Sequence, residues 1–497
     1  MLKPIEILDE VIFYNIGGFP ALILVLICTG LFFSFYLKFP NITLFKHSIR
    51  EATKGSSDSG LLKSKQSLFT SLSSIIGMGS VAGVAMAVRI GGPGAVIWLM
   101  IMVLFSMNTS FAETLLAVKY KSVNMEDKSI DCAPVRYIKE SLSEINLKSF
   151  GVFLATVYGI MYFIGLIGTQ MYQVREVTSL LMQFGPLANA KFVITILFDI
   201  IVILVILGGI TNVAKILEKL LPAICGSYLI SVIVILLFNL KRLPLAIWVM
   251  LREAFRLKSA TGGIIGALCT GVQRGTFSNE AGLGTATTPY AAMESDNIVK
   301  PAGLGSMNPL FVGIVCLATG LIIVSSGIYL NPAVSDSGIV MVKNAFSTAF
   351  SWFPYVLCVI IPMLSLSLCI SSAFNAQNVY QHYFGKKTTI IYFLIQFLLI
   401  LSSAFTNPED VMKIADVLYM SIAIPNIICL LLVREIIKKT YETNKNALFG
   451  DSGAGNVLSS PKSPEKSPEK SLPNSPESSK EESSSESSGS SSSDESS

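Results

Sequence analysis

Long apolar segments recur along this chain up to about residue 435, separated by short polar stretches. Each is close to the roughly 20 residues that a helix needs to cross a membrane. About eleven are expected, with bounds near 13–37, 67–88, 95–118, 149–182, 192–210, 217–239, 262–288, 304–328, 354–380, 389–405 and 413–434. The pattern predicts an all-α polytopic membrane protein whose transmembrane domain spans residues 1–440.

The seventh segment carries a polar stretch that a continuous membrane helix would not contain. Residues 273–288 read Q-R-G-T-F-S-N-E-A-G-L-G-T-A-T-T, with Arg274, Glu280 and three glycines. A glycine weakens a helix interior by about 1 kcal/mol against alanine, and a charge at mid-membrane costs about 2.5–3.5 kcal/mol. Such backbone is tolerated only where it is buried in protein or lines a watery cavity. The stretch predicts a discontinuous helix at a binding site; the alternative is a polar loop that binds nothing.

The second segment is interrupted in a similar way. Residues 73–83 read S-S-I-I-G-M-G-S-V-A-G, so glycines and serines break an apolar span. Small residues of this kind also allow close helix packing, which is the alternative. The two interruptions lie five segments apart, at corresponding positions of two five-helix halves. That spacing predicts a five-plus-five inverted-repeat core with a binding site where the two halves meet.

An unwound membrane helix leaves backbone amides on one half-helix and carbonyls on the other without helical partners. Amides at a half-helix N-terminus attract a carboxylate, and carbonyls attract Na⁺ or an ammonium group. A zwitterionic amino acid presents both charges at once. We therefore expect a substrate carboxylate at the amides of Met78 and Gly79, and its ammonium group at carbonyls of residues 275–279. The break was expected near Gly77–Gly79 in the second segment and Gly275–Gly282 in the seventh.

Composition supports membrane insertion and excludes several other classes. Of the 497 residues, 52% are hydrophobic and 14% are charged, whereas a soluble globular protein has about 25% charged residues. The net charge of +4 gives no argument for nucleic-acid binding. The 8 cysteines are scattered without a C-x-x-C pair, and there are 2 histidines, which argues against a disulfide framework or a metal cofactor. No nucleotide-binding glycine loop or nucleophile–base pair is evident, so an enzyme or an ATP-driven pump is not expected.

Lysines and arginines in the loops predict the orientation. Basic loops follow the first and third segments and place their side in the cytoplasm, so that the N-terminus is outside and the C-terminus inside the cell (inner) membrane. The loop at 241–258 carries five basic residues and disagrees. From Asp451 to Ser497 the chain becomes a Ser-, Glu- and Pro-rich tail with nearly no apolar residues, which predicts a disordered cytoplasmic segment.

Several motifs together carry a family resemblance. They are R-G-T-F-S-N-E-A-G-L-G-T-A (274–286), I-G-M-G-S-V-A-G-V-A-M-A-V-R-I-G-G-P-G-A (76–95), I-L-G-G-I (206–210) and A-D-V-L-Y-M-S-I-A-I-P-N (415–426). Up to about residue 435 the chain resembles the alanine or glycine:cation symporter family, the sodium:alanine symporters. The resemblance implies a leucine-transporter-type fold and uptake of alanine or glycine, including D-alanine, coupled to Na⁺ or H⁺. Two departures bear on specificity, because Ser80 and Ser372 stand where the family has Asn and Trp.

Candidate site residues follow from the two breaks and the resemblance. For the substrate they are Gly77, Met78, Gly79, Ser80, Gln170, Phe277, Ser278, Asn279 and Ser372. For Na⁺ they are Ser73, Ile76, Ser367 and Ser371, although a membrane serine often bonds to its own helix instead. Arg274 and Glu280 are expected to form an ion pair or a gate. Two other functions stay open: an uncoupled amino-acid facilitator, and an amino-acid sensor that signals through the tail.

Overall fold

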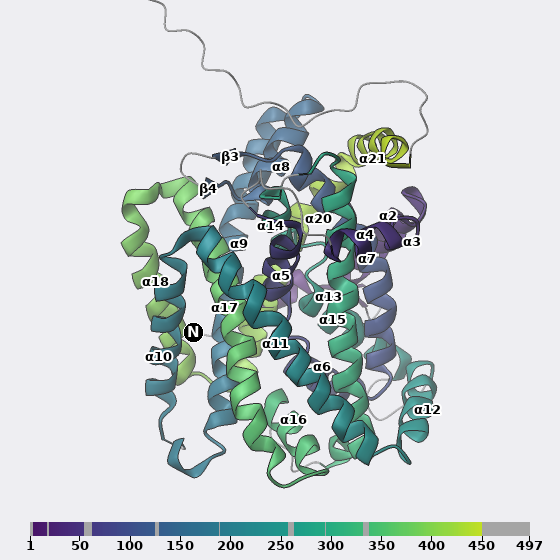
Figure 1. Cartoon of the computed structure of the whole chain (residues 1–497), viewed down its shortest axis with the longest axis vertical. Coiled ribbons are helices and arrows are strands. Elements are labelled where there is room, and N and C mark those ends of the chain that lie inside the picture. The colour runs from purple at the N-terminus through teal and green to yellow at the C-terminus, as the bar shows by residue number, and fades with distance from the viewer. Residues whose placement is uncertain are drawn as a thin grey trace, which may run out of the picture. The chain divides into compact units, whose positions relative to one another are not determined.

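The computed structural model describes residues 3–16, 19–53, 62–124, 129–187, 189–256, 263–293, 295–331 and 337–449 (Figure 1). The expected tail from Asp451 onward lies outside these residues. Almost all of the described chain is helical. Two short hairpins complete it, one of β1 (Asn15–Ile16) with β2 (Phe19–Pro20) and one of β3 (Val123–Asn124) with β4 (Ser129–Ile130).

The helices fall into an N-terminal group, two halves with a linking helix, and a C-terminal helix. The N-terminal group is α1 (Lys3–Ile12), α2 (Ala21–Tyr36), α3 (Pro40–Thr43) and α4 (Phe45–Thr53). The first half is α5 (Ser64–Ile75), α6 (Ala82–Gly91), α7 (Ala95–Lys119), α8 (Ala133–Glu144), α9 (Lys148–Leu181), α10 (Lys191–Ile206) and α11 (Gly209–Phe238), and α12 (Leu243–Ala254) links it to the second. The second half is α13 (Gly263–Asn279), α14 (Thr288–Ala291), α15 (Val299–Ser326), α16 (Gly338–Ser347), α17 (Phe353–Phe384), α18 (Thr389–Ser402), α19 (Pro408–Ser421) and α20 (Ala423–Leu432), followed by α21 (Arg434–Phe449).

The predicted apolar segments are helices, which confirms the all-α membrane fold. Within the described residues, 7 helical spans are long and apolar enough to cross a membrane, and α2 and α6 are shorter apolar helices. Every remaining predicted segment coincides with a helix or with two helices separated by a short break. The protein is therefore a multi-pass membrane protein.

Contacts between helices repeat from one half to the other, as an inverted repeat requires. Helix α9 of the first half contacts α19 of the second, and the equivalent helices α17 and α11 are also in contact. In the same way α13 contacts α7, and the equivalent broken helix α5–α6 contacts α15. Helices α10 and α18, each the fourth spanning segment of its half, lie side by side (Figure 1). The short helices α8 and α16, each between the second and third long helices of its half, lie at opposite ends (Figure 1).

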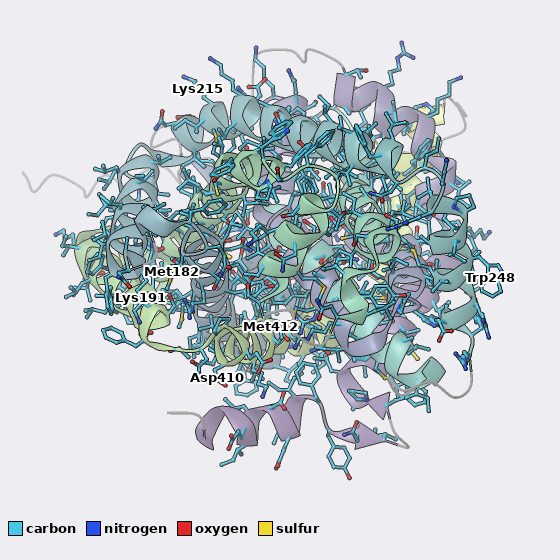
Figure 2. All side chains as sticks on the ribbon, turned by 90° about the horizontal axis from the view of Figure 1, so that it is seen from below. Met182, Lys191, Lys215, Trp248, Asp410 and Met412 are labelled. Atoms are coloured by element: carbon cyan, nitrogen blue, oxygen red, sulfur yellow. The ribbon has the colours of Figure 1, made fainter. Side chains whose placement is uncertain are left out.

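Different short helices cover the two ends of the helical body. Helices α4, α8 and α21 lie at one end, and α12 and α16 lie at the other (Figure 1). Helix α1 packs along α19, beside the stretch that carries Asp410 and Met412 (Figure 2). The broken helices α5–α6 and α13–α14 lie inside this arrangement, with buried backbone at both interruptions.

Candidate functional site

The first break has the position that the sequence predicts. Helix α5 ends at Ile75 and α6 begins at Ala82, so residues 76–81 are not helical. The Gly77 carbonyl accepts hydrogen bonds from the backbone and hydroxyl of Ser80, at 3.2 and 2.8 Å, and the Met78 carbonyl accepts one from the Gly83 amide at 2.8 Å. This turn is fully buried, and in the described part of the chain no backbone hydrogen bond outside the helices starts from the amides of Gly77 or Gly79.

A glutamine from α9 is bonded to the first break. The Met78 amide donates to the Gln173 Oε1 atom at 2.9 Å, and the Ser365 hydroxyl of α17 donates to the same oxygen at 3.2 Å. A Cβ at Gly77 would collide with the Cδ1 atom of Leu368 and come within 2.9 Å of the Gln173 amide, so a larger residue there would displace the side chain that binds Met78. The Met78 amide, which we expected to bind the substrate carboxylate, thus donates to the side-chain oxygen of Gln173.

Gln170, the glutamine selected from the sequence, has a different environment. Its Nε2 atom donates to the Leu166 carbonyl of its own helix at 3.2 Å, and its buried Oε1 atom has no hydrogen-bond partner among the described residues. The structure therefore brings Gln173, which lies about one turn further along α9, to the first break rather than Gln170. Both side chains are buried.

The second break begins later than expected. Helix α13 continues through Asn279, and the irregular backbone covers residues 280–284. Glu280, Gly282 and Gly284 have positive φ angles of 57°, 92° and 75°. The prediction that unwinding starts at Gly275 is wrong, because Gly275 is helical and packs against Leu99, whose atoms lie 3.5 Å from the position of a Cβ.

Side chains from distant helices support the second break. The Asn426 amide donates to the Glu113 carboxylate at 2.6 Å and to the Gly282 carbonyl at 2.8 Å. The Tyr158 hydroxyl donates to the Leu283 carbonyl at 2.7 Å. Without these side-chain partners, the backbone carbonyls of the second break would be buried without hydrogen bonds, which costs several kcal/mol for each group in a membrane. Glu113 is therefore part of the support of the second break.

The first break meets the last turn of α13 at Gly79 and Phe277. A Cβ on Gly79 would lie 3.2 Å from the Phe277 ring and 3.4 Å from the Ser278 hydroxyl oxygen. The Phe277 ring contacts Tyr172 of α9 and Tyr419 of α19, with ring centroids 5.9 and 5.5 Å apart. These contacts assemble the predicted residues Gly79, Phe277 and Ser278 with two aromatic side chains that the sequence did not select.

Three further predicted substrate residues have distinct surroundings. The Asn279 Nδ2 atom donates to the Ser106 hydroxyl at 3.1 Å, and its Oδ1 atom accepts from the Ala281 amide at 3.1 Å, so both ends of this side chain are bonded within the protein. Ser80 bonds within the first break, as described above. Ser372 is buried in α17, and the hydroxyl of Ser278 is buried without a hydrogen-bond partner in the described structure.

Arg274 forms a buried ion pair with an unexpected partner. Its Nη1 atom donates to the Asp416 Oδ1 atom of α19 at 2.9 Å, and its Nη2 atom contacts the other carboxylate oxygen. The two side chains are 4% and 7% exposed. The expected pairing of Arg274 with Glu280 is wrong, since the Glu280 carboxylate instead accepts a hydrogen bond from the Thr285 hydroxyl.

The predicted sodium residues separate into two groups. The Ser371 hydroxyl donates across the helix interface to the Thr70 carbonyl of α5 at 3.4 Å. Ser73 and Ser367 donate to carbonyls of their own helices, both at 2.8 Å. The Thr70 and Ser67 hydroxyls of α5 are buried without a hydrogen-bond partner among the described residues. The Ser371 hydroxyl and the Thr70 carbonyl therefore meet between α5 and α17, before the first break.

Comparisons with known proteins agree on a family and a fold. A family model described as the sodium:alanine symporter family matches residues 5–450. The sodium/alanine symporter AgcS of Methanococcus maripaludis is 30% identical over 441 residues, covering 86% of this chain and 95% of that protein. The probable sodium/glutamine symporter GlnT of Bacillus subtilis is 25% identical, covering 86% of this chain and 88% of its own length. The structure of MhsT in complex with L-phenylalanine has a TM-score of 0.50 at 14% identity, over 78% of this chain and 99% of that chain.

Proposed function

The chain belongs to the sodium:alanine symporter family, and we propose that it imports a small neutral amino acid together with Na⁺ by alternating access. The family and its relatives are transporters, not enzymes. One observation carries the proposal most strongly: the two broken helices meet at Gly79 and Phe277, within a leucine-transporter-type core. Such breaks present backbone charge of both signs to a ligand that has both.

The substrate carboxylate would bind at the first break. The Met78 amide donates a hydrogen bond to the Gln173 Oε1 atom. The substrate carboxylate would displace that oxygen and accept the hydrogen bond in its place. The Gly79 amide can add a second donor, because among the described residues it donates no backbone hydrogen bond outside the helices. The amino group then faces the carbonyl end of α13, where the last turn carries partial negative charge. This end of α13, at residues 276–279, replaces the unwound 275–279 backbone as the partner of the ammonium group.

The side chain of the substrate would face the aromatic group around Phe277. Phe277 is in ring contact with Tyr172 and with Tyr419, and all three are buried, so these bulky walls favour a substrate with a small side chain such as alanine or glycine. Ser80, Ser278 and Ser372 contribute the small polar positions of the predicted pocket. A relative named as a sodium/glutamine symporter indicates that side-chain preference varies within the family, so the pocket residues decide it.

Sodium would bind between α5 and α17. Ser371 and the Thr70 carbonyl supply two oxygen atoms there, and the Thr70 hydroxyl is a third that has no described partner. Hard monovalent and divalent cations favour oxygen ligands of this kind. The carbonyl of Ile76 lies at the start of the break and completes the proposed set, whereas Ser73 and Ser367 remain bonded within their own helices. This placement joins the ion to the same break that binds the substrate.

The buried pair of Arg274 and Asp416 would close one side of the pathway. The Arg274 side chain lies 3.8 Å from the position of a Cβ on Gly83, the second residue of α6, just beyond the first break. The helices α12 and α16 lie toward that end of the body (Figure 1). With the N-terminus outside and the C-terminus inside, as the basic loops favour, this is the outer side. The pair then acts as an outer gate of a cell-membrane symporter.

Uptake by reconstituted vesicles tests the proposal. Purified protein in proteoliposomes should accumulate labelled alanine or glycine above the outside concentration when Na⁺ is imposed outside. Competition by each neutral amino acid, including D-alanine, would define the side-chain range. Equilibration without accumulation, at the same rate with and without a Na⁺ gradient, would favour the uncoupled facilitator. Binding without any flux, together with a signal that requires residues 451–497, would favour the sensor.

A further inference from the structure

A cavity of about 320 Å³ opens between the C-terminal end of α2 and the C-terminal helix α21. Three of the residues that line it are lysines, Lys38 on the α2 side and Lys438 and Lys445 on α21. Tyr36 and Tyr441 form part of its wall, and Glu442 is its one acidic lining residue. We call this cavity the lysine pocket. It is separate from the broken helices and from the proposed amino-acid site.

The positive charge of the lysine pocket is not neutralised by the protein. Among the described residues, none of the three lysines lies within ion-pair distance of a carboxylate. Two of them instead lie over aromatic rings, Lys438 at 4.9 Å from the Tyr36 centroid and Lys445 at 5.4 Å from the Tyr441 centroid. A ring holds the ammonium group in place by cation–π attraction without removing its charge. Two carboxylates oppose the three lysines: Glu442 in the lining, and Glu435, which accepts a hydrogen bond from the Tyr36 hydroxyl at 2.7 Å. The remaining excess of one positive charge favours an anion.

The walls of the lysine pocket are held apart by packing. Tyr441 of α21 is buried against Phe111, with ring centroids 5.0 Å apart, and its hydroxyl lies 3.2 Å from the Thr43 hydroxyl. On the other wall, Lys38 and Phe39 both adopt left-handed backbone, with φ angles of 57° and 54°. Such conformations are uncommon for side chains other than glycine and persist where the surrounding structure fixes them. The lysines are therefore presented by two fixed walls.

The surroundings of the lysine pocket indicate the source of the anion. Helix α2 is an apolar helix of the membrane domain, and Phe35 beside the pocket and Ile42 just after it are 68% and 69% exposed. A phosphate ion from solution would use only the charges. A lipid would use both features, its phosphate between the lysines and its acyl chains along the exposed apolar side chains. We propose that the lysine pocket binds the phosphate group of an anionic membrane lipid.

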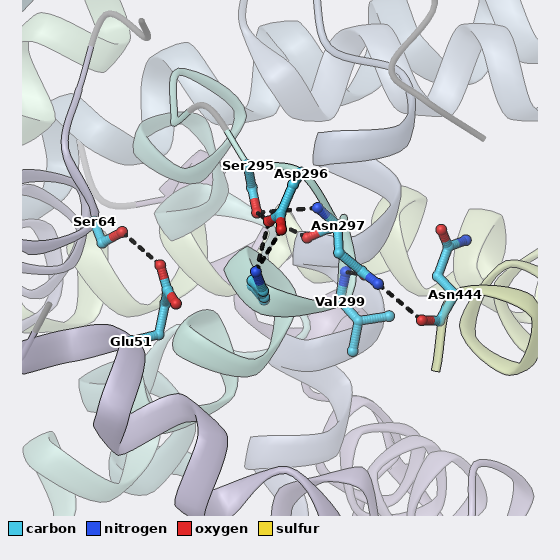
Figure 3. A network of polar contacts seen from close by, with 8 residues as sticks. Glu51, Ser64, Ser295, Asp296, Asn297, Val299 and Asn444 are labelled. Carbon is cyan, nitrogen blue, oxygen red and sulfur yellow. Dashed lines mark hydrogen bonds and ion pairs between the residues drawn. The ribbon is translucent and has the colours of Figure 1, made fainter. Parts of the chain in front are cut away.

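Occupancy of the lysine pocket would also bear on the position of α21. The Asn297 Nδ2 atom donates to the Asn444 carbonyl of α21 at 2.9 Å, and Asn297 lies in the connection between α14 and α15 (Figure 3). In the same connection, hydrogen bonds from Lys300 hold the pKa of the Asp296 carboxyl below its ordinary value, against the opposing effect of burial. A lipid bound to both α2 and α21 would therefore hold α21 in place, and α21 contacts the connection between α14 and α15 that follows the second break.

The test measures lipid retention by native mass spectrometry of the purified full chain, exchanged into mixtures of phosphatidylglycerol and phosphatidylcholine. The wild type should retain phosphatidylglycerol preferentially. A lysine near an anionic lipid contributes about 1 kcal/mol, so Lys438→Gln should weaken retention about fivefold. The double variant Lys438→Gln/Lys445→Gln should weaken it about 25-fold. Lys439→Gln is the matched control, since Lys439 is an exposed neighbour on the same helix that does not line the pocket.

Three outcomes would overturn the proposal. Equal losses in Lys438→Gln and Lys439→Gln would mean that only the general surface charge attracts lipid. Equal retention of phosphatidylcholine by the wild type would mean that no anionic group is recognised. If inorganic phosphate alone displaced phosphatidylglycerol at equal concentration, a soluble anion would be the ligand. Should α21 variants fail to fold, Lys38→Gln tests the opposite wall with the same expected fivefold loss.

Discussion

Replacing Asp416 with asparagine should open the proposed outer gate. The substitution keeps the size of the side chain but leaves the Arg274 guanidinium, which is 4% exposed, without a counter-charge. Breaking a buried ion pair by removing one partner costs about 3–5 kcal/mol. If that cost falls only on the closed conformation, the closed-to-open ratio falls by about a hundredfold to several thousandfold, at about 1.4 kcal/mol per factor of ten. A mostly closed transporter would then become mostly open.

Cysteine alkylation measures this change directly. A cysteine placed at Ser278, which is buried beside Gly79, should react slowly with a polar thiol reagent in the parent protein and much faster with Asp416→Asn. The same eight native cysteines are present in both proteins, so their reaction is subtracted. Asp296→Asn is the control, since Asp296 pairs with Lys300 at a site where its side chain is 77% exposed and such pairs contribute at most about 1 kcal/mol. An unchanged alkylation rate in Asp416→Asn would refute the gate.

Three further predictions test the sites and the tail. Gly79→Val should abolish amino-acid binding in a filter assay, because its side chain meets the Phe277 ring, whereas Gly226→Ala, with nothing within 4 Å, should bind normally. Ser371→Ala should raise the Na⁺ concentration for half-maximal uptake several-fold but leave uptake at saturating Na⁺ nearly unchanged, and an equal effect on both would argue against a Na⁺ ligand. Removal of residues 451–497 should leave uptake and the melting temperature within error, since this composition cannot bury a core; a lower melting temperature would show that the tail docks.

The sequence located the first break well because its signal is local. Gly77 and Gly79 interrupt an apolar span, and the non-helical turn covers residues 76–81. The predicted position of the second break was too early in the chain, because a glycine in a membrane helix can serve either close packing or unwinding. Gly275 provides close packing against Leu99, while the turn itself starts at Glu280, which adopts a positive φ that few non-glycine residues adopt. Glycine content alone does not distinguish packing from unwinding.

Partners from distant parts of the chain could not be predicted. Arg274 and Asp416 are 142 positions apart, and no spacing rule joins them. The choice between Gln170 and Gln173 depends on how α9 is rotated about its axis. Three positions turn an ideal helix by about 300°, so the two side chains point about 60° apart, and only packing against α5 and α17 decides which one reaches Met78.

Calorimetric titration of the amino acid with and without Na⁺ tests the central claim of ion-coupled binding. Purified protein is titrated with alanine in saturating Na⁺ and again with choline in its place, and then with Na⁺ at zero and saturating alanine. The proposed sites share the first break, so each ligand should raise the affinity for the other by the same factor, about 5- to 150-fold or about 1–3 kcal/mol. Equal alanine affinities in Na⁺ and choline would contradict sodium coupling.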